Sequence, residues 1–277
     1  MNYKYIDIHS HLDMAEEAGD LSGVLKRMHE TGVGTITVGT DLKSSIEAVK
    51  IASENENVWA CIGAHPEDDR TFIFKEEDFA ELVKNPKVVA IGECGLDYFR
   101  LGQGLPLTRQ GESLTEAIQE EKARQKREFI KQIEFSIKYN KPLMLHIRDA
   151  HEDAYEILKK YPKARGNLHF FTGSSETAKK FINLGYTISF PGVITFPPKA
   201  DQPRADAEDA IRNIPLSMIH AETDSPFAAP IPYRGKKNEP AYVIEIVKKI
   251  AELRGEDEEK VRLQLLENAR KVFGMSI

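Results

Sequence analysis

The stretch Val88-Val89-Ala90-Ile91-Gly92-Glu93-Cys94 indicates the fold class, because a near-continuous apolar run leads into a carboxylate. A run without polar alternation is typical of a parallel strand that is covered on both faces. In such proteins helices alternate with the strands and cover the sheet. The stretch therefore predicts an α/β protein with a polar side chain where a buried strand ends.

Seven further short, apolar and β-branched runs alternate with helical patterns along the chain. The eight predicted strands are Tyr5–His11, Thr35–Thr40, Val58–Ala64, Val88–Cys94, Pro142–Ile147, Asn167–Phe171, Thr187–Phe190 and Met218–Asp224. Eight strand-then-helix units favour a (β/α)₈ TIM barrel over an open doubly wound sheet, although strand number alone does not establish closure.

Amphipathic patterns predict the helices. The clearest are Leu21–Glu30, Gln125–Tyr139, Ala241–Leu253 and Glu258–Phe273. The segment Arg100–Glu121 interrupts the alternation and predicts an insertion above the barrel, either a lid or a disordered loop. Pro197–Pro203 is a second predicted loop. Because the chain has no internal repeat and no linker, residues 1–277 are expected to form one domain.

The composition limits the class of protein. Hydrophobic residues make up 41% of the chain and charged residues 30%, which suits a large core beneath a well-solvated surface. No apolar run approaches the roughly 20 residues that span a bilayer. Met1–Ile8 enters a strand pattern without the regions of a signal peptide. We expect a cytoplasmic protein with no membrane partner and no obligate protein partner.

The cysteines and the net charge exclude other classes. Cys61 and Cys94 lie in separate predicted strands and are expected to be small core residues, neither a disulfide framework nor a thiolate metal site. The formal net charge of −6 argues against a basic surface that grips nucleic acid. A local basic rim around one cleft stays compatible with this charge.

The first predicted strand ends with Asp7-Ile8-His9-Ser10-His11. Side chains two residues apart share a strand face, so Asp7, His9 and His11 point the same way. Two imidazoles on one face can chelate a metal ion, with Asp7 below them as an orienting partner. The motif alone is weak evidence, because two ordinary histidines would give the same pattern.

Four more predicted strands end in residues that bind metals. These residues are Glu93, His146, His169 and Asp224, in the fourth, fifth, sixth and eighth strands. The carboxyl ends of the strands form the rim where barrel enzymes place their chemistry. Each histidine alone is more simply explained as a core residue. Agreement of five strands at the same end favours a metal site.

Six motifs follow one another over essentially the whole chain: Ile6–Leu12, Gly63–Pro66, Gly92–Tyr98, His169–Gly173, Glu222–Pro226 and Arg234–Pro240. Together they resemble the TatD family of metal-dependent hydrolases, which are deoxyribonuclease-like members of the amidohydrolase superfamily. The resemblance implies a site for two divalent metal ions. By motif, His9, His11 and Asp224 would hold one ion, His146 and His169 the other, and Glu93 would bridge the two.

The resemblance also predicts a deoxyribonuclease, in particular an exonuclease, that cleaves phosphodiester bonds by a metal-activated water. Four neutral imidazoles and two carboxylates leave two dications with a net positive charge, which favours an anionic phosphodiester over a neutral amide. Asp224 would act as ligand and general base beside the bridging Glu93. Imidazole-rich ligation suits zinc, manganese or iron better than magnesium, yet the family is usually regarded as magnesium-dependent, so the identity of the ion stays open.

Two other functions fit the same motifs. Related barrels hydrolyse amides, esters and lactones, and some TatD-like members remove D-amino acids from tRNA, so an amidohydrolase or esterase is the alternative enzyme. The insertion at about 100–121 would then shape the pocket. A metal-binding scaffold without activity is disfavoured, because all six predicted ligands are present.

His65, Arg148, Arg234 and Asn238 are the candidates for substrate contacts. His65 follows the third strand, and Glu67 stands where the family usually has a second histidine. Arg148 could bind phosphate or form a surface salt bridge. Asn238 is expected to cap the helix after the last strand, and with Arg234 before it this helix start could bind an anion.

Four polar residues receive other roles. His220 shares the face of Asp224 and is predicted to be buried and paired with a carboxylate, not to be a ligand. His29 and His151 fall in helical patterns and are expected to face solvent. Asp97 is expected to orient the site or a substrate loop.

Overall fold

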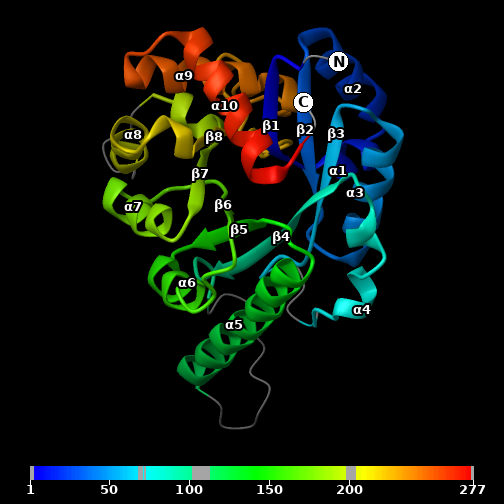
Figure 1. The fold of residues 1–277 in the computed structure, drawn as a ribbon, viewed down its shortest axis with the longest axis vertical. Coiled ribbons are helices and arrows are strands. Elements are labelled where there is room, and N and C mark those ends of the chain that lie inside the picture. The colour runs from blue at the N-terminus through cyan, green and yellow to red at the C-terminus, as the bar shows by residue number, and fades with distance from the viewer. Residues whose placement is uncertain (1–2, 68–70, 72, 102–112, 198–203, 276–277) are drawn as a thin grey trace.

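The computed structural model describes residues 3–67, 71, 73–101, 113–197 and 204–275, and eight parallel strands form its centre (Figure 1). The strands are β1 (Tyr5–Ser10), β2 (Val33–Val38), β3 (Val58–Ile62), β4 (Val88–Asp97), β5 (Leu143–Arg148), β6 (Gly166–Leu168), β7 (Tyr186–Phe190) and β8 (Ile219–Ala221). Each pairs in parallel with the next along the chain. The predicted α/β class and eight strands are confirmed.

The barrel closes between β1 and the segment after β8. The Asp224 amide donates to the His9 carbonyl oxygen at 2.9 Å, and the His11 amide donates to that of Ser225 at 2.8 Å. Ser10 and Ser225 form a parallel bridge at the same place. The predicted TIM barrel is confirmed, and its seam joins two segments that carry predicted metal ligands.

Helices lie around the outside of the sheet (Figure 1). They are α1 (Leu12–Glu17), α2 (Leu21–Thr31), α3 (Leu42–Glu54), α4 (Glu76–Phe79), α5 (Leu114–Lys138), α6 (His151–Leu158), α7 (Ser175–Asn183), α8 (Arg204–Asn213), α9 (Val243–Arg254) and α10 (Glu258–Phe273). The side chain of Asp41 caps the first turn of α3 by accepting from the Ser44 amide at 2.7 Å. Gly255 ends α9 in a left-handed conformation, with φ 61°, that glycine adopts without strain.

Some bounds differ from the predictions. β4 continues to Asp97, and β8 ends at Ala221, so Asp224 lies in the following loop and not in a strand. α5 begins at Leu114, with Ser113 as its N-cap. The predicted insertion is therefore helical from Leu114 onward, neither lid nor loop there. Its residues 102–112, and residues 198–203 of the predicted proline-rich loop, lie outside the described residues.

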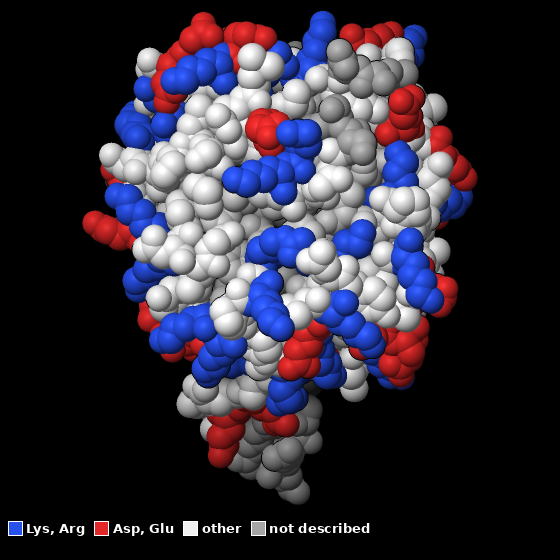
Figure 2. Space-filling view, viewed as in Figure 1, with Lys and Arg blue, Asp and Glu red and all other residues white. Residues whose placement is uncertain are grey.

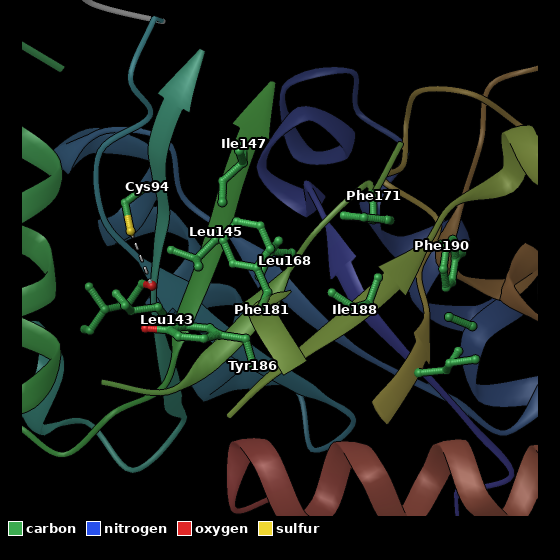
Figure 3. Close-up of a cluster of buried hydrophobic side chains, with 14 of the residues drawn as sticks. Cys94, Leu143, Leu145, Ile147, Leu168, Phe171, Phe181, Tyr186, Ile188 and Phe190 are labelled. Carbon is green, nitrogen blue, oxygen red and sulfur yellow. Dashed lines mark hydrogen bonds between the residues drawn. The ribbon is translucent and has the colours of Figure 1, made fainter. Parts of the chain in front are cut away.

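Apolar side chains of the strands pack beneath the helices. Figure 3 shows Leu143 and Leu145 of β5 in the same cluster as Ile188 of β7 and Phe181 of α7. All four are buried. Cys94 belongs to this cluster as a free, buried thiol, as predicted. This core is the rigid support for the residues at the strand ends.

Charged residues of both signs share the surface. On the face in Figure 2, Lys and Arg side chains lie among Asp and Glu side chains, without a continuous basic layer. This distribution agrees with the net charge of −6. Within the described part of the chain, the structure contains no helix with the length and apolar character of a membrane span.

Candidate metal centre

Glu93 lies among imidazoles at the carboxyl ends of the strands. Its Oε1 is 2.7 Å from His146 Nδ1 and 3.0 Å from His169 Nε2. Its Oε2 is 3.3 Å from His9 Nε2 and 4.0 Å from His11 Nε2. The two oxygens of one buried carboxylate therefore face two different pairs of histidines. A bridging ligand needs this arrangement.

A bulge in β4 turns Glu93 toward the histidines. The pairing of β4 with β5 shifts between Ile91 and Cys94, and such an extra residue changes the direction in which side chains point. Gly92 has φ 149°, and a Cβ at this position would clash with the carbonyl oxygen of Met144. Glycine therefore lets the two strands approach closely where the ligand is presented.

Asp224 completes the side of the site that His9 and His11 form. Its Oδ1 lies 3.4 Å from His11 Nε2 and 3.8 Å from His9 Nε2. Asp224 has φ 54°, a left-handed conformation that costs a residue with a side chain about 1–3 kcal/mol. The hydrogen bond from its amide to His9 at the seam holds this conformation. Barrel closure thus directs the carboxylate toward the histidines.

Asp7 links the two segments from below. Its carboxylate accepts from the amide and hydroxyl of Thr223 at 2.8 and 2.6 Å, and from the His9 amide at 3.3 Å. Burial raises the pKa of Asp7 to about 8, although the Thr223 hydrogen bonds oppose this shift. Asp7 was predicted to be an orienting partner below the histidines, and in the structure it accepts from the main chain of His9.

The orientation of His11 shows that a cation fits this site. Its Nδ1 lies 3.0 Å from the carbonyl oxygen of Val38, which can only accept, so Nδ1 carries the hydrogen. In the neutral ring, Nε2 then turns a lone pair toward the oxygens of Asp224 and Glu93. A proton or a metal ion is needed between these atoms. Burial alone would lower the pKa of His11, but Asp224 raises it to about 9.

His146 lies between two carboxylates. Its Nδ1 faces Glu93 at 2.7 Å, and its Nε2 faces Asp97 Oδ2 at 2.9 Å. Burial lowers the pKa of His146, but these two carboxylates outweigh it and raise the pKa to about 9. The orienting role predicted for Asp97 is directed at this ring. The extension of β4 to Asp97 brings the carboxylate within reach, and the sequence prediction ended the strand at Cys94.

His169 has a carboxylate neighbour to which sequence reasoning gave no role. Glu222 Oε1 lies 3.4 Å from His169 Nδ1, without the geometry of a hydrogen bond. Glu222 is fully buried and accepts from the Phe170 amide at 2.5 Å and from the Ser189 hydroxyl at 2.7 Å. The position of Glu222 two residues before Asp224 is the sequence feature that could have indicated a role at the site. Its hydrogen-bond partners, however, are distant in the sequence.

A cavity of about 670 Å³ opens onto this group. Among the residues that line it are His11, Glu93, His146, His169, Asp224, His65, Asp97 and Arg148. A larger groove of about 930 Å³ between α1 and α3 contains none of the converging residues. The smaller cavity is therefore the candidate active site.

Two of the four predicted substrate residues line the cavity. His65 Nδ1 accepts from the Glu67 amide at 3.2 Å, so the neutral ring carries its hydrogen on Nε2, which lies 3.8 Å from Glu93 Oε1. Arg148 is exposed, and its guanidinium lies 3.7 Å from the ring centre of Phe99. Within the described ranges Arg148 forms no ion pair, so the surface salt bridge considered for it is not found there.

The other two candidates are directed elsewhere. Arg234 is not among the residues that line the cavity and stacks on Phe196 at 4.4 Å. Asn238 is buried and is not a helix cap. Its amide donates to the carbonyl oxygens of Thr223 and Phe227 at 2.8 and 2.5 Å. Asn238 therefore fixes the loop around Asp224, because its two hydrogen bonds hold the main chain on both sides of this residue.

The remaining histidines give a mixed result. His29 is exposed, as predicted. His151 is half-buried against Phe171 and Phe181, so its predicted exposure is wrong. His220 is buried, but it contacts the hydroxyl of Thr187 at 3.0 Å and no carboxylate among the described residues, so the predicted pairing is also wrong.

Comparison with known proteins agrees with this geometry. The family model described as TatD related DNase matches residues 6–274. The metal-dependent hydrolase YabD of Bacillus subtilis is 35% identical over 273 residues, which cover 96% of this chain and 98% of YabD. The 3'-5' ssDNA/RNA exonuclease TatD of Escherichia fergusonii is 32% identical, with 98% and 99% covered.

A solved structure shows the same fold. The crystal structure of YjjV, a TatD homologue from Escherichia coli, has a TM-score of 0.83 and 27% identity, and 99% of this chain and 100% of that one are covered. Family model, relatives and structure agree over the full length. The chain therefore belongs to the TatD family of metal-dependent hydrolases.

Proposed function

We propose that this protein is a nuclease that hydrolyses phosphodiester bonds at the end of a nucleic acid strand with two divalent metal ions. The observation that carries the proposal is the position of Glu93, whose two carboxylate oxygens face separate pairs of histidines. The name of the Escherichia fergusonii relative supports exonuclease action.

We assign the histidines by their distances to Glu93, and Asp224 by its distances to His11 and His9. His9, His11 and Asp224 would hold one ion with Oε2, and His146 and His169 the other with Oε1. Two dications, two carboxylates and four neutral imidazoles leave a positive site, which suits an anionic phosphodiester. The nitrogen-rich ligand set favours zinc or manganese, and magnesium is the third candidate.

Bound divalent ions would supply Lewis acidity, lowering the pKa of water and polarising the phosphate. Asp224 is the general base in this proposal, because of the two carboxylates assigned as metal ligands it is the one that does not bridge. Asp97 keeps the ring of His146 in one orientation by accepting from Nε2. The Nε2 hydrogen of His65 points into the cavity as a donor for a phosphate oxygen.

End-labelled oligonucleotides test this function. The purified protein should degrade 3'- or 5'-labelled single-stranded DNA, EDTA should abolish the reaction, and added divalent metal should restore it. Glu93→Gln should lower turnover by orders of magnitude while the thermal midpoint stays near that of the parent. Full activity of this variant would refute the proposed site.

The same assay separates other bonds from phosphodiesters. A D-aminoacyl-tRNA and a small lactone should be turned over far more slowly than DNA. Preference for either substrate would assign this chain to amide or ester chemistry instead. Elemental analysis of the same preparation identifies the metal.

A further inference from the structure

Two exposed phenylalanines stand on opposite sides of the candidate metal centre. Phe99 and Phe227 each expose 50% of their surface, and both line the cavity that contains Glu93. Phe99 follows β4 and Phe227 follows β8, and these strands are four positions apart in an eight-stranded barrel. The two rings therefore flank the site across its mouth.

Exposure of these rings is unusual within this chain. Among the described phenylalanines, only Phe99 and Phe227 belong to the exposed large hydrophobic residues. Leaving such a side chain in water forgoes the stabilisation that burial would give. Because both rings lie at one cavity, a ligand bound in this cavity could cover them.

Main-chain hydrogen bonds anchor both phenylalanine positions beside the site. The Phe99 amide donates to Asp97 Oδ1 at 2.9 Å, and the Phe227 amide donates to the Asp224 carbonyl oxygen at 2.9 Å. Asn238 holds the Phe227 carbonyl oxygen, and the Phe227 ring packs edge-on against His11 at 6.2 Å between centres. The main chain at both phenylalanines is thus anchored to the segments that carry Asp97 and Asp224.

A cation accompanies one of the rings. The guanidinium of Arg148 stacks on Phe99 at 3.7 Å from its centre, and within the described ranges it has no carboxylate partner. Unstacked bases of single-stranded nucleic acid bind to aromatic rings and to guanidinium planes in this way. The positive charge beside the stack also suits a phosphate.

We propose that Phe99 with Arg148, and Phe227, are two base-stacking platforms that hold the terminal and penultimate nucleotides on either side of the scissile phosphate. This inference rests on the proposed nuclease function and names the residues that select an unpaired end. Bases within a duplex are already stacked and paired, so only a single-stranded or frayed end can occupy both platforms.

Kinetics with abasic oligonucleotides tests the platforms. Phe99→Ala and Phe227→Ala should each lower kcat/KM on a single-stranded decamer roughly 5- to 100-fold, which corresponds to the loss of one stacked base. Phe99→Trp and Phe227→Trp should stay within about threefold of the parent, since tryptophan also stacks. Leu263→Ala is the matched control, because Leu263 is also 50% exposed but lies on α10, outside the cavity.

The decisive result is the coupling between ring and base. On a decamer whose terminal nucleotide is abasic, the effect of one alanine variant should disappear, and on a penultimate abasic decamer the effect of the other should disappear. Equal losses on intact and abasic substrates, or full activity of both alanine variants, would overturn the platforms. If the parent protein cleaves the decamer, such a result leaves the nuclease function intact. If the parent cleaves no oligonucleotide, the nuclease function fails first and the platforms with it.

Discussion

Replacing Glu222 with glutamine tests how the structure supports His169. Glutamine keeps the size of the side chain and can still accept from the Phe170 amide, while its NH₂ group faces the Ser189 hydroxyl, which can turn to accept. The change therefore removes the negative charge 3.4 Å from His169 Nδ1 and leaves the packing intact. Loss of such a supporting carboxylate typically weakens metal binding 10- to 100-fold.

The assay is a metal titration followed by calorimetry, alongside a thermal midpoint. Glu222→Gln should bind metal about 10- to 100-fold more weakly and unfold near the parent's midpoint. Glu222→Ala should in addition lose about 1–3 kcal/mol of stability, because the partly buried Phe170 amide loses its acceptor. Ser189 adds less to this cost, since its hydroxyl also lies 3.2 Å from the Leu168 carbonyl oxygen.

A buried carboxylate outside the cavity provides the control. Glu239 is buried and accepts from Arg27 Nε at 2.6 Å. Glu239→Gln should leave metal affinity unchanged. Parent-like metal affinity of Glu222→Gln would contradict this prediction, because it would show that the charge on Glu222 has no influence on His169 as a ligand.

Three further predictions follow from single contacts. His11 and His146 have pKa values of about 9 in the metal-free protein, so their protons compete with the metal ion. The metal affinity should therefore rise between pH 6 and pH 8 by up to about tenfold per pH unit for each displaced proton. A metal affinity that does not change with pH would contradict this. Burial lowers the pKa of His220 to about 3, whereas in the unfolded chain this histidine binds a proton below about pH 6.5. The free energy of unfolding should therefore fall by up to about 1.4 kcal/mol per pH unit between about pH 6.5 and pH 3. Urea denaturation should show a smaller fall for His220→Asn. Asn238→Ala leaves two carbonyl groups without their donor and should cost about 2 kcal/mol with reduced turnover; a parent-like thermal midpoint would argue against the clamp.

The hydrophobic pattern of the sequence was sufficient to predict the fold. Strand runs such as Val88–Ile91 are apolar on both faces, and their alternation with helical patterns predicts the barrel. The convergence of Glu93 with the four histidines also followed, because the carboxyl ends of parallel strands meet at one rim of a barrel. These features depend on local sequence and on topology alone.

Contacts between distant side chains could not be predicted in the same way. Glu222, which follows β8, reaches His169, which follows β6, and among the described residues His220 contacts the hydroxyl of Thr187 and not a carboxylate. Asn238 has the sequence of a helix cap, yet its amide bonds back to the loop of Asp224. In each case the hydrogen-bond partner depends on which strands are neighbours and on where each strand ends. A change of one residue in strand length would bring different side chains together.

Anomalous diffraction from crystals grown with manganese tests whether Glu93 lies between two metal ions. We expect two manganese peaks per chain, one beside each carboxylate oxygen of Glu93, with His9, His11 and Asp224 around the first and His146 and His169 around the second. A single peak away from Glu93, or no peak at this end of the barrel, would contradict it.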